Sequence, residues 1–155
     1  MSAPSVAIEP RPERVEALVA ECLAERAADP ARATRPITSQ LAPGLPEHPV
    51  DRLLMKEAIA GLLDEATRRA APSTRLRVTL KANRNALMFA VKSPGPGLSD
   101  AEREDLFGGE PREGTLARVR AIVGAHGGVA WANGIAGKGI TYYFSLPIRR
   151  PAAGG

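Results

Sequence analysis

The sequence predicts a two-layer α/β sandwich, in which about three helices cover one face of a mixed, mostly antiparallel sheet. Three observations support this prediction. Apolar residues recur with helical spacing in three long segments, and they alternate in pairs of strand-like segments. These two kinds of segment follow one another along the chain, and helices layered on one face of a sheet satisfy that order best.

In the first part of the chain, residues 5–9 form a short β-like run that two prolines end. Residues 12–28 are expected to be helical, because their apolar residues fall on one stripe: Val15, Leu18, Val19, Cys22 and Leu23. Asp29 precedes a proline, which disfavours the α region and ends this helix. A strand over residues 36–42 and a stiff proline-rich loop over residues 43–49 follow.

A second helix is predicted over residues 50–71, with an inner face made of Val50, Leu54, Ala58, Gly61, Leu62 and Glu65. Strands over residues 76–82 and 86–92 then alternate apolar and polar side chains, and the tight turn at residues 83–85 joins them into a hairpin.

The last part of the chain begins with a glycine-proline loop at residues 93–98. Ser99 and Glu102 have the spacing of a capping box for a short helix. A polar loop over residues 108–114 precedes a third main helix over residues 115–125, which a glycine cap at 126–128 ends. Two strands, at residues 129–132 and 140–146, flank a turn at residues 133–139.

Composition is that of one ordinary globular domain: 155 residues, 44% hydrophobic and 25% charged, with a net charge of +4. The domain is expected to span residues 5–148, with flexible tails at 1–4 and 149–155. No basic stripe with interleaved aromatics is present, so we expect no nucleic-acid binding. The sequence has neither a zinc-ligand cluster nor a run of about 18 apolar residues, and we expect a cytoplasmic protein without membrane insertion.

Several motifs stand in a fixed order in the second half of the chain. Residues 61–66 read Gly-Leu-Leu-Asp-Glu-Ala, and residues 93–98 read Ser-Pro-Gly-Pro-Gly-Leu. The helix 116–125 ends at His-Gly-Gly, and Trp131 and the closing Phe-Ser-Leu-Pro follow. In this order and at these separations, the motifs resemble the asparagine box, the first glycine box and the closing elements of the ATP-binding domain of sensor histidine kinases. That family shares the Bergerat fold with gyrase, Hsp90 and MutL.

The resemblance implies that Mg-ATP would lie between the asparagine-box helix and a lid. Glu65 stands where the family has an asparagine whose amide oxygen holds magnesium. A carboxylate also binds a hard cation, but it brings negative charge next to a triphosphate. The alternative is that Glu65 is an exposed or paired helix charge. Gly61, one turn earlier, replaces a polar or acidic residue that is the general base in hydrolytic members.

In the first glycine box, Ser93 stands where the resemblance implies an aspartate that accepts the adenine amino proton. Its hydroxyl can accept a hydrogen bond, but it is shorter and uncharged. Gly95 and Gly97 are retained, and they either bring the backbone close to a ligand or serve the turn alone.

The second glycine box is represented by Gly114 and Thr115 at the start of the third main helix, where the family's backbone N–H groups hold phosphates. The stretch around them carries mixed charge and little glycine. Lys138, in the last turn, either reaches a phosphate or is a solvated turn lysine. These substitutions predict weak or no ATP binding and no catalytic residue.

A histidine kinase also needs a phosphoacceptor histidine on a helical hairpin. His48 lies in a proline-rich loop and His126 at the end of a helix, so we expect no autophosphorylation within this chain. The sequence therefore favours a degenerate domain that acts as a regulatory module, docking on a kinase helical hairpin or a response regulator, and it is compatible with a homodimer. Two alternatives stay open: a working catalytic domain of a larger sensor kinase, and an anti-sigma-like regulator.

Overall fold

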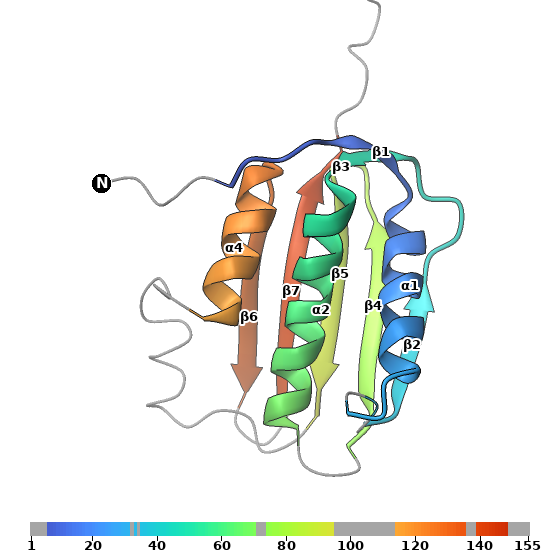
Figure 1. The fold of residues 1–155 in the computed structure, drawn as a ribbon, viewed down its shortest axis with the longest axis vertical. Helices are drawn as coiled ribbons and strands as arrows, with labels where there is room; N and C mark the ends of the chain where they lie inside the picture. Colours follow the sequence, from blue (N-terminus) through green and yellow to red (C-terminus); the bar gives the residue numbers. More distant parts are fainter. Residues whose placement is uncertain are drawn as a thin grey trace, which may run out of the picture.

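The computed structural model describes residues 6–31, 33, 35–70, 74–94, 114–135 and 139–148. Its architecture is the predicted α/β sandwich (Figure 1). A five-stranded sheet runs in the order β2-β4-β5-β7-β6, and among the described residues the helices α1, α2 and α4 lie on one of its faces. Only the β2–β4 pair is parallel; the other neighbours in this sheet are antiparallel, so the sheet is mixed as expected.

The predicted hairpin is confirmed as β4 (Leu76–Ala82) and β5 (Ala86–Ser93). The side chain of Asn83 holds its turn, since Oδ1 accepts hydrogen bonds from the backbone N–H groups of Asn85 and Ala86 at 2.7 and 2.9 Å. The strand expected over residues 36–42 is β2 (Ile37–Leu41), which extends the sheet beyond β4.

The closing elements also agree with the sequence. Helix α4 (Thr115–Ala125) has the predicted bounds, and the chain leaves it through Gly127 at φ 79°, a conformation that favours glycine. Strands β6 (Val129–Ile135) and β7 (Gly139–Pro147) are longer than expected, so part of the predicted turn is strand. The residues between them, 136–138, and the predicted short helix at Ser99 lie outside the described residues.

The prediction for the residues before the first helix was wrong. Residues 6–9 have no regular secondary structure, and the strand β1 forms at Arg11–Glu13, which overlaps the predicted start of that helix. It pairs antiparallel with β3 (His48–Val50), which was expected to be loop and helix. Pro12 and Pro49 are register partners in this ladder. Proline has no backbone N–H, but residues of a non-hydrogen-bonded pair donate none to each other, so the pairing loses no hydrogen bond here.

Both N-terminal helices are therefore shorter than predicted: α1 is Val15–Ala27 and α2 is Arg52–Arg69. Helix α2 begins after Asp51, whose Oδ1 accepts a hydrogen bond from Leu54 N at 3.1 Å. The predicted inner face of α2 was incomplete. Leu54 is only partly buried, whereas four side chains outside the predicted stripe are buried: Met55, Ile59, Leu63 and Ala66.

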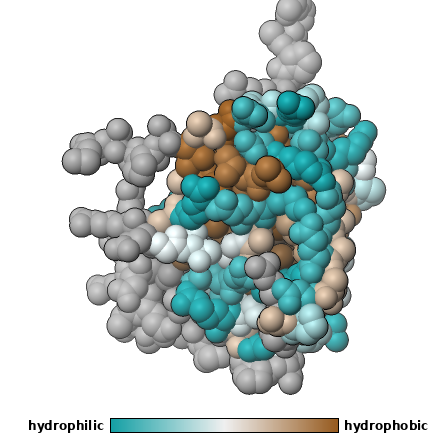
Figure 2. All heavy atoms as spheres, viewed as in Figure 1, coloured by the Kyte–Doolittle hydropathy of each residue, from teal (hydrophilic) through white to brown (hydrophobic). Residues whose placement is uncertain are grey.

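The core lies between the helices and the sheet. Phe89 of β5 and Phe144 of β7 are register partners whose rings stack with centroids 5.0 Å apart. Figure 2 shows that the helical side of the molecule is mostly hydrophilic, with a hydrophobic area toward the end where β1 and β3 lie. Leu53, in the first turn of α2 at that end, is 79% exposed.

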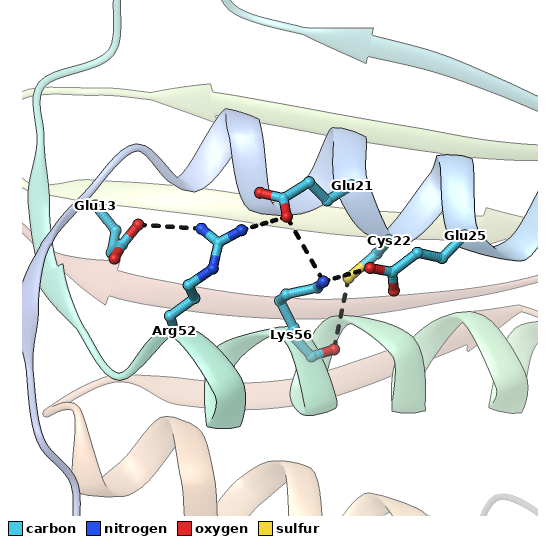
Figure 3. Close-up of polar contacts among 6 residues, drawn as sticks. All are labelled: Glu13, Glu21, Cys22, Glu25, Arg52 and Lys56. Carbon is cyan, nitrogen blue, oxygen red and sulfur yellow. Dashed lines mark hydrogen bonds and ion pairs between the residues drawn. The ribbon is translucent and has the colours of Figure 1, made fainter.

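A polar network joins α1 to α2 (Figure 3). Arg52 of α2 contacts Glu13 and Glu21, and Lys56 one turn later contacts Glu21 and Glu25. The hydrogen bond from Arg52 lowers the pKa of Glu21 below its usual value. These cations of α2 therefore meet carboxylates across the α1–α2 interface.

Cys22 lies beneath this network on the buried side of α1. Its Sγ lies 3.6 Å from the carbonyl oxygen of Lys56, and burial raises the pKa of its thiol to about 11. The thiol is therefore protonated at neutral pH, as a small buried hydrophobic side chain would be.

Candidate functional site

The predicted site positions that the structure describes lie toward one end of the sandwich. Helix α2 ends, strand β5 ends and helix α4 begins at this end (Figure 1). Glu65 comes from the last turns of α2, Ser93 is the last residue of β5, and Gly114 and Thr115 begin α4. The remaining predicted residues, Gly95, Gly97 and Lys138, lie outside the described residues.

Glu65 is buried, with only 4% of its surface exposed. Its Oε1 accepts a short hydrogen bond from Arg68 Nη2, three residues later on the same helix. Glu65 is thus a paired helix charge and not an exposed one, and its predicted place at the magnesium position stays a prediction. Arg68 was not singled out in the sequence, although its i,i+3 spacing from a carboxylate is a signal for such a pair.

The neighbouring carboxylate is also engaged. Asp64 Oδ1 accepts a hydrogen bond of 2.7 Å from Nη1 of Arg26, which reaches across from α1 and is itself only 5% exposed. Nη2 of the same arginine donates to Thr67 Oγ1 at 3.0 Å. The two adjacent acids of α2 are thus each neutralised by an arginine, one from α1 and one from α2.

Gly61 has a packing role that the sequence did not reveal. A Cβ atom built at this residue would lie 3.0 Å from Cγ2 of Val119 and 3.1 Å from Cγ2 of Thr115. Carbon atoms pack best at about 3.5–4.0 Å, so α4 approaches too closely for a larger residue to be accommodated without adjustment. The place of the expected polar side chain on α2 is therefore filled by α4.

Ser93 is buried at 4% exposure and points toward the helices, in the same alternation as Leu87, Phe89 and Val91. Its register partner on β7 is Ile140. Its side chain is therefore buried at the position where the resemblance implied a carboxylate.

Gly114 is the residue before α4 and has φ 98°, which L side chains rarely adopt. A Cβ there would meet nothing within 4 Å, so conformation and not space requires glycine. Thr115 is exposed, but its methyl group points toward Gly61.

Among the described residues, a cavity lined in part by Leu62, Leu116, Val119 and Ala132 has a volume of about 10 Å³. Small-molecule pockets are usually about 300–1,000 Å³. A cavity of about 450 Å³ lies instead between the end of α1 and β2, lined in part by Arg26 and Arg35, and none of the predicted site residues lines it.

His126 is held by both ring nitrogens. Nε2 accepts a hydrogen bond of 2.9 Å from the backbone N–H of Asp51, and Nδ1 lies 2.8 Å from the carbonyl oxygen of Ile122. Accepting at Nε2 assigns the proton to Nδ1, which donates to that carbonyl. The residue joins the end of α4 to the start of α2, at the opposite end of the fold from Glu65.

Among the described residues, no group of three or more His, Cys, Asp or Glu side chains is placed to hold a metal ion. No helix in the described parts of the chain is long and apolar enough to cross a membrane.

Comparison with known proteins identifies the family. The model of the histidine kinase-, DNA gyrase B- and HSP90-like ATPases matches residues 50–150. The adaptive-response sensory kinase SasA of Synechococcus sp. (strain JA-3-3Ab) is 34% identical over 118 residues, covering 68% of this chain and 31% of the kinase. The methanogenesis regulatory histidine kinase FilI of Methanothrix harundinacea (strain 6Ac) is 32% identical over 124 residues, covering 74% of this chain and 14% of FilI. The chain thus spans a third or less of these relatives.

Solved structures show the same fold. The catalytic domain of histidine kinase ThkA, in a nucleotide-free form, superposes with a TM-score of 0.75 at 17% identity, covering 90% of this chain and 96% of that domain. Full-length ShkA in complex with AMPPNP superposes with a TM-score of 0.76 at 20% identity, covering 97% of this chain and 34% of ShkA. With the family model matching about two thirds of its residues, the chain belongs to the histidine kinase-, DNA gyrase B- and HSP90-like ATPase family.

Proposed function

We propose that the chain is a histidine-kinase-type ATPase domain of a cytoplasmic two-component signalling protein, and that it acts as an interaction or regulatory module with weak or no Mg-ATP binding. Its partner would be a kinase helical hairpin or a response regulator. The observation that carries the proposal is the state of Glu65, which is buried and bound to Arg68 at the position expected to hold magnesium.

The described residues at this end of the fold do not fit Mg-ATP. A magnesium ion prefers oxygen ligands in near-octahedral geometry and keeps several waters. Binding at Glu65 would require a buried carboxylate to exchange its arginine partner for the ion. Gly61 offers no side chain, and Ser93 offers a buried hydroxyl in place of a carboxylate. We therefore assign no step of phosphoryl transfer to this chain.

Thermal melting with and without millimolar Mg-ATP tests the proposal. A ligand present at 100 times its dissociation constant adds about 2.7 kcal/mol of stability. For a domain of this size that gain corresponds to a rise of roughly 5–11 °C in Tm. We expect no shift. A clear rise, with saturation as nucleotide is added, would overturn the proposal.

The double variant Glu65→Asn with Ser93→Asp serves as the matched comparison. If these two positions cause the loss, the variant gains a nucleotide-dependent rise in Tm that the unchanged chain lacks. If the variant is folded but still shows no rise, the second glycine box is the larger defect. The nucleotide-dependent change in Tm of each single variant shows whether the metal position or the adenine position accounts for the loss.

One observation favours a second function, that of a working nucleotide-binding domain. The side chain of Arg68 is 67% exposed although its guanidinium contacts Glu65, so a cation is available to a phosphate at this end of the fold. On this alternative, Mg-ATP raises the Tm of the unchanged chain, and Arg68→Ala removes most of that rise. A chain that shows no rise to begin with excludes this role for Arg68.

A further inference from the structure

The sheet face opposite the helices is open in the described part of the chain, and its side chains follow from strand alternation. On β4 and β5 the apolar residues point toward the helices, so Arg77, Lys81, Met88 and Lys92 point the other way. Figure 1 shows the described helices together on the other side of the sheet. Arg77, Lys81 and Lys92 are exposed.

This face of the sheet carries positive charge. The five strands of the sheet contain no aspartate or glutamate. Arg77 and Lys92 are direct register partners, an arrangement in which like charges destabilise a sheet. None of the described residues forms an ion pair with Arg77, Lys81 or Lys92.

The helical layer is built in the opposite way. Most of its described cations, though not Arg120, meet acids within the fold: Arg26 pairs with Asp64, Arg52 with Glu21, Lys56 with Glu25, Arg68 with Glu65 and Arg118 with Glu57. Arg77, Lys81 and Lys92 are therefore three cations without an acidic partner in the described fold that lie together on one surface of the sheet. An acidic ligand on the sheet would complement this cluster.

Apolar groups lie beside these cations. Trp131 of β6 and Tyr143 of β7 are register partners on the same face, with ring centroids 4.9 Å apart and an interplanar angle of 11°. Both are half-buried, and Val129, two residues before Trp131, is 60% exposed. Tryptophan, tyrosine and arginine are the residue types most enriched at the energetic centres of protein interfaces.

We propose that this open face, made of Arg77, Lys81, Met88, Lys92, Trp131 and Tyr143, binds an acidic protein segment that also carries apolar side chains. Carboxylates of the segment meet the cations of β4 and β5, and its apolar side chains pack on the Trp131–Tyr143 pair. The inference deepens the proposed interaction role by naming the chemistry of the partner, and it does not depend on whether nucleotide binds.

A protein segment fits this surface better than a nucleic acid. The two rings stack on each other, which occupies a face of each ring that a base would otherwise use. The cations are confined to two strands and the net charge of the chain is only +4, whereas nucleic-acid sites neutralise a longer line of phosphates.

Trp131 is the only tryptophan of the chain, so its fluorescence reports directly on the open face. The probe is a short tryptophan-free peptide that alternates glutamate with leucine and phenylalanine. We expect a saturable change in Trp131 fluorescence that weakens as salt is added. The same peptide with lysine in place of glutamate should give no saturable change, and a single strand of oligo-thymidylate should bind more weakly than the acidic peptide.

The variant Arg77→Glu with Lys92→Glu should weaken peptide binding roughly tenfold or more, since each exchange replaces an attraction by a repulsion. The control for Arg77→Glu alone is Arg11→Glu, which makes the same change of charge at an exposed residue of β1, outside the five-stranded sheet, and should bind as the unchanged chain does. Equal weakening by Arg77→Glu and Arg11→Glu, or the absence of any saturable binding, would overturn the proposal. Tighter binding of oligo-thymidylate would assign the face to nucleic acid instead.

Thermal stability is a second readout, and it distinguishes loss of the peptide contact from loss of folding. The single variant Arg77→Glu places a carboxylate opposite Lys92, so its Tm should rise slightly while its affinity for the acidic peptide falls. A fall in both Tm and affinity would point to damage of the sheet, and an unchanged affinity would count against the proposed contact.

Discussion

Gly61→Ala is the sharpest test of how helices α2 and α4 meet at the candidate site. The added Cβ would lie 3.0 Å from Val119 Cγ2 and 3.1 Å from Thr115 Cγ2. Alanine gains about 1 kcal/mol over glycine in a helix interior. Overpacking of this kind costs about 1–3 kcal/mol. We therefore expect a net loss of about 0–2 kcal/mol, with a fall in Tm of roughly 2–4 °C for each kcal/mol lost.

Urea unfolding of Gly61→Ala, measured with and without Thr115→Ser, separates the gain in helix propensity from the cost of overpacking. Thr115→Ser removes the methyl group that the new Cβ would meet, so Gly61→Ala should be less destabilising in that background by roughly 0.5–1.5 kcal/mol. Gly124→Ala is the matched control, because Gly124 also lies in a helix but a Cβ there meets nothing within 4 Å. It should stabilise the protein by about 1 kcal/mol.

The reasoning fails if Gly61→Ala stabilises the protein as much as Gly124→Ala does and shows no coupling to Thr115. In that case the two helices are further apart than described, and the missing polar side chain on α2 has no packing explanation. A strong coupling would instead show that regaining a larger residue at Gly61 requires a change on α4 as well.

The remaining predictions concern the rest of the fold. His126→Ala leaves the backbone N–H of Asp51 without its acceptor and should cost about 1–3 kcal/mol in urea unfolding, more than a surface substitution on α4 would. The hydrogen bond from Arg118 lowers the pKa of Glu57 below its usual 4.5, so this pair stabilises the fold above about pH 4.5 and is lost as the pH falls through the lowered pKa. Between pH 7 and 3, Glu57→Gln should therefore show a smaller fall in Tm than the unchanged chain. Cys22, with its pKa of about 11, should react with a thiol reagent at neutral pH only as the protein unfolds, and rapid labelling of the folded chain would contradict its burial.

Local sequence patterns predicted the elements that residues close together in the sequence define. The alternation in β4 and β5 and the spacing of apolar residues in α4 identified these elements with nearly their observed bounds. The strands β1 and β3 were missed because each is short and contains a proline, which argues against a strand when only its neighbours in sequence are considered. Their pairing joins segments far apart in the chain, and no local pattern contains that information.

The candidate site divides in the same way. Residue identity and the family resemblance led to the prediction that Gly61, Glu65 and Ser93 differ from a magnesium- and adenine-binding set, and this stays a prediction. They did not show that Glu65 is buried against Arg68, because burial depends on how α2 packs on β5 and β7. Nor did they show that α4 fills the space at Gly61.

Chain order and side-chain type were thus enough to indicate the family, the two layers and the substituted positions, since helical and strand periodicity are properties of neighbouring residues. Register and helix packing decided the rest. The alignment of Arg77 with Lys92 across two strands and the contact of Gly61 with Thr115 across two helices exist only in the folded chain. Both contacts form because packing of the common core brings these backbones close together.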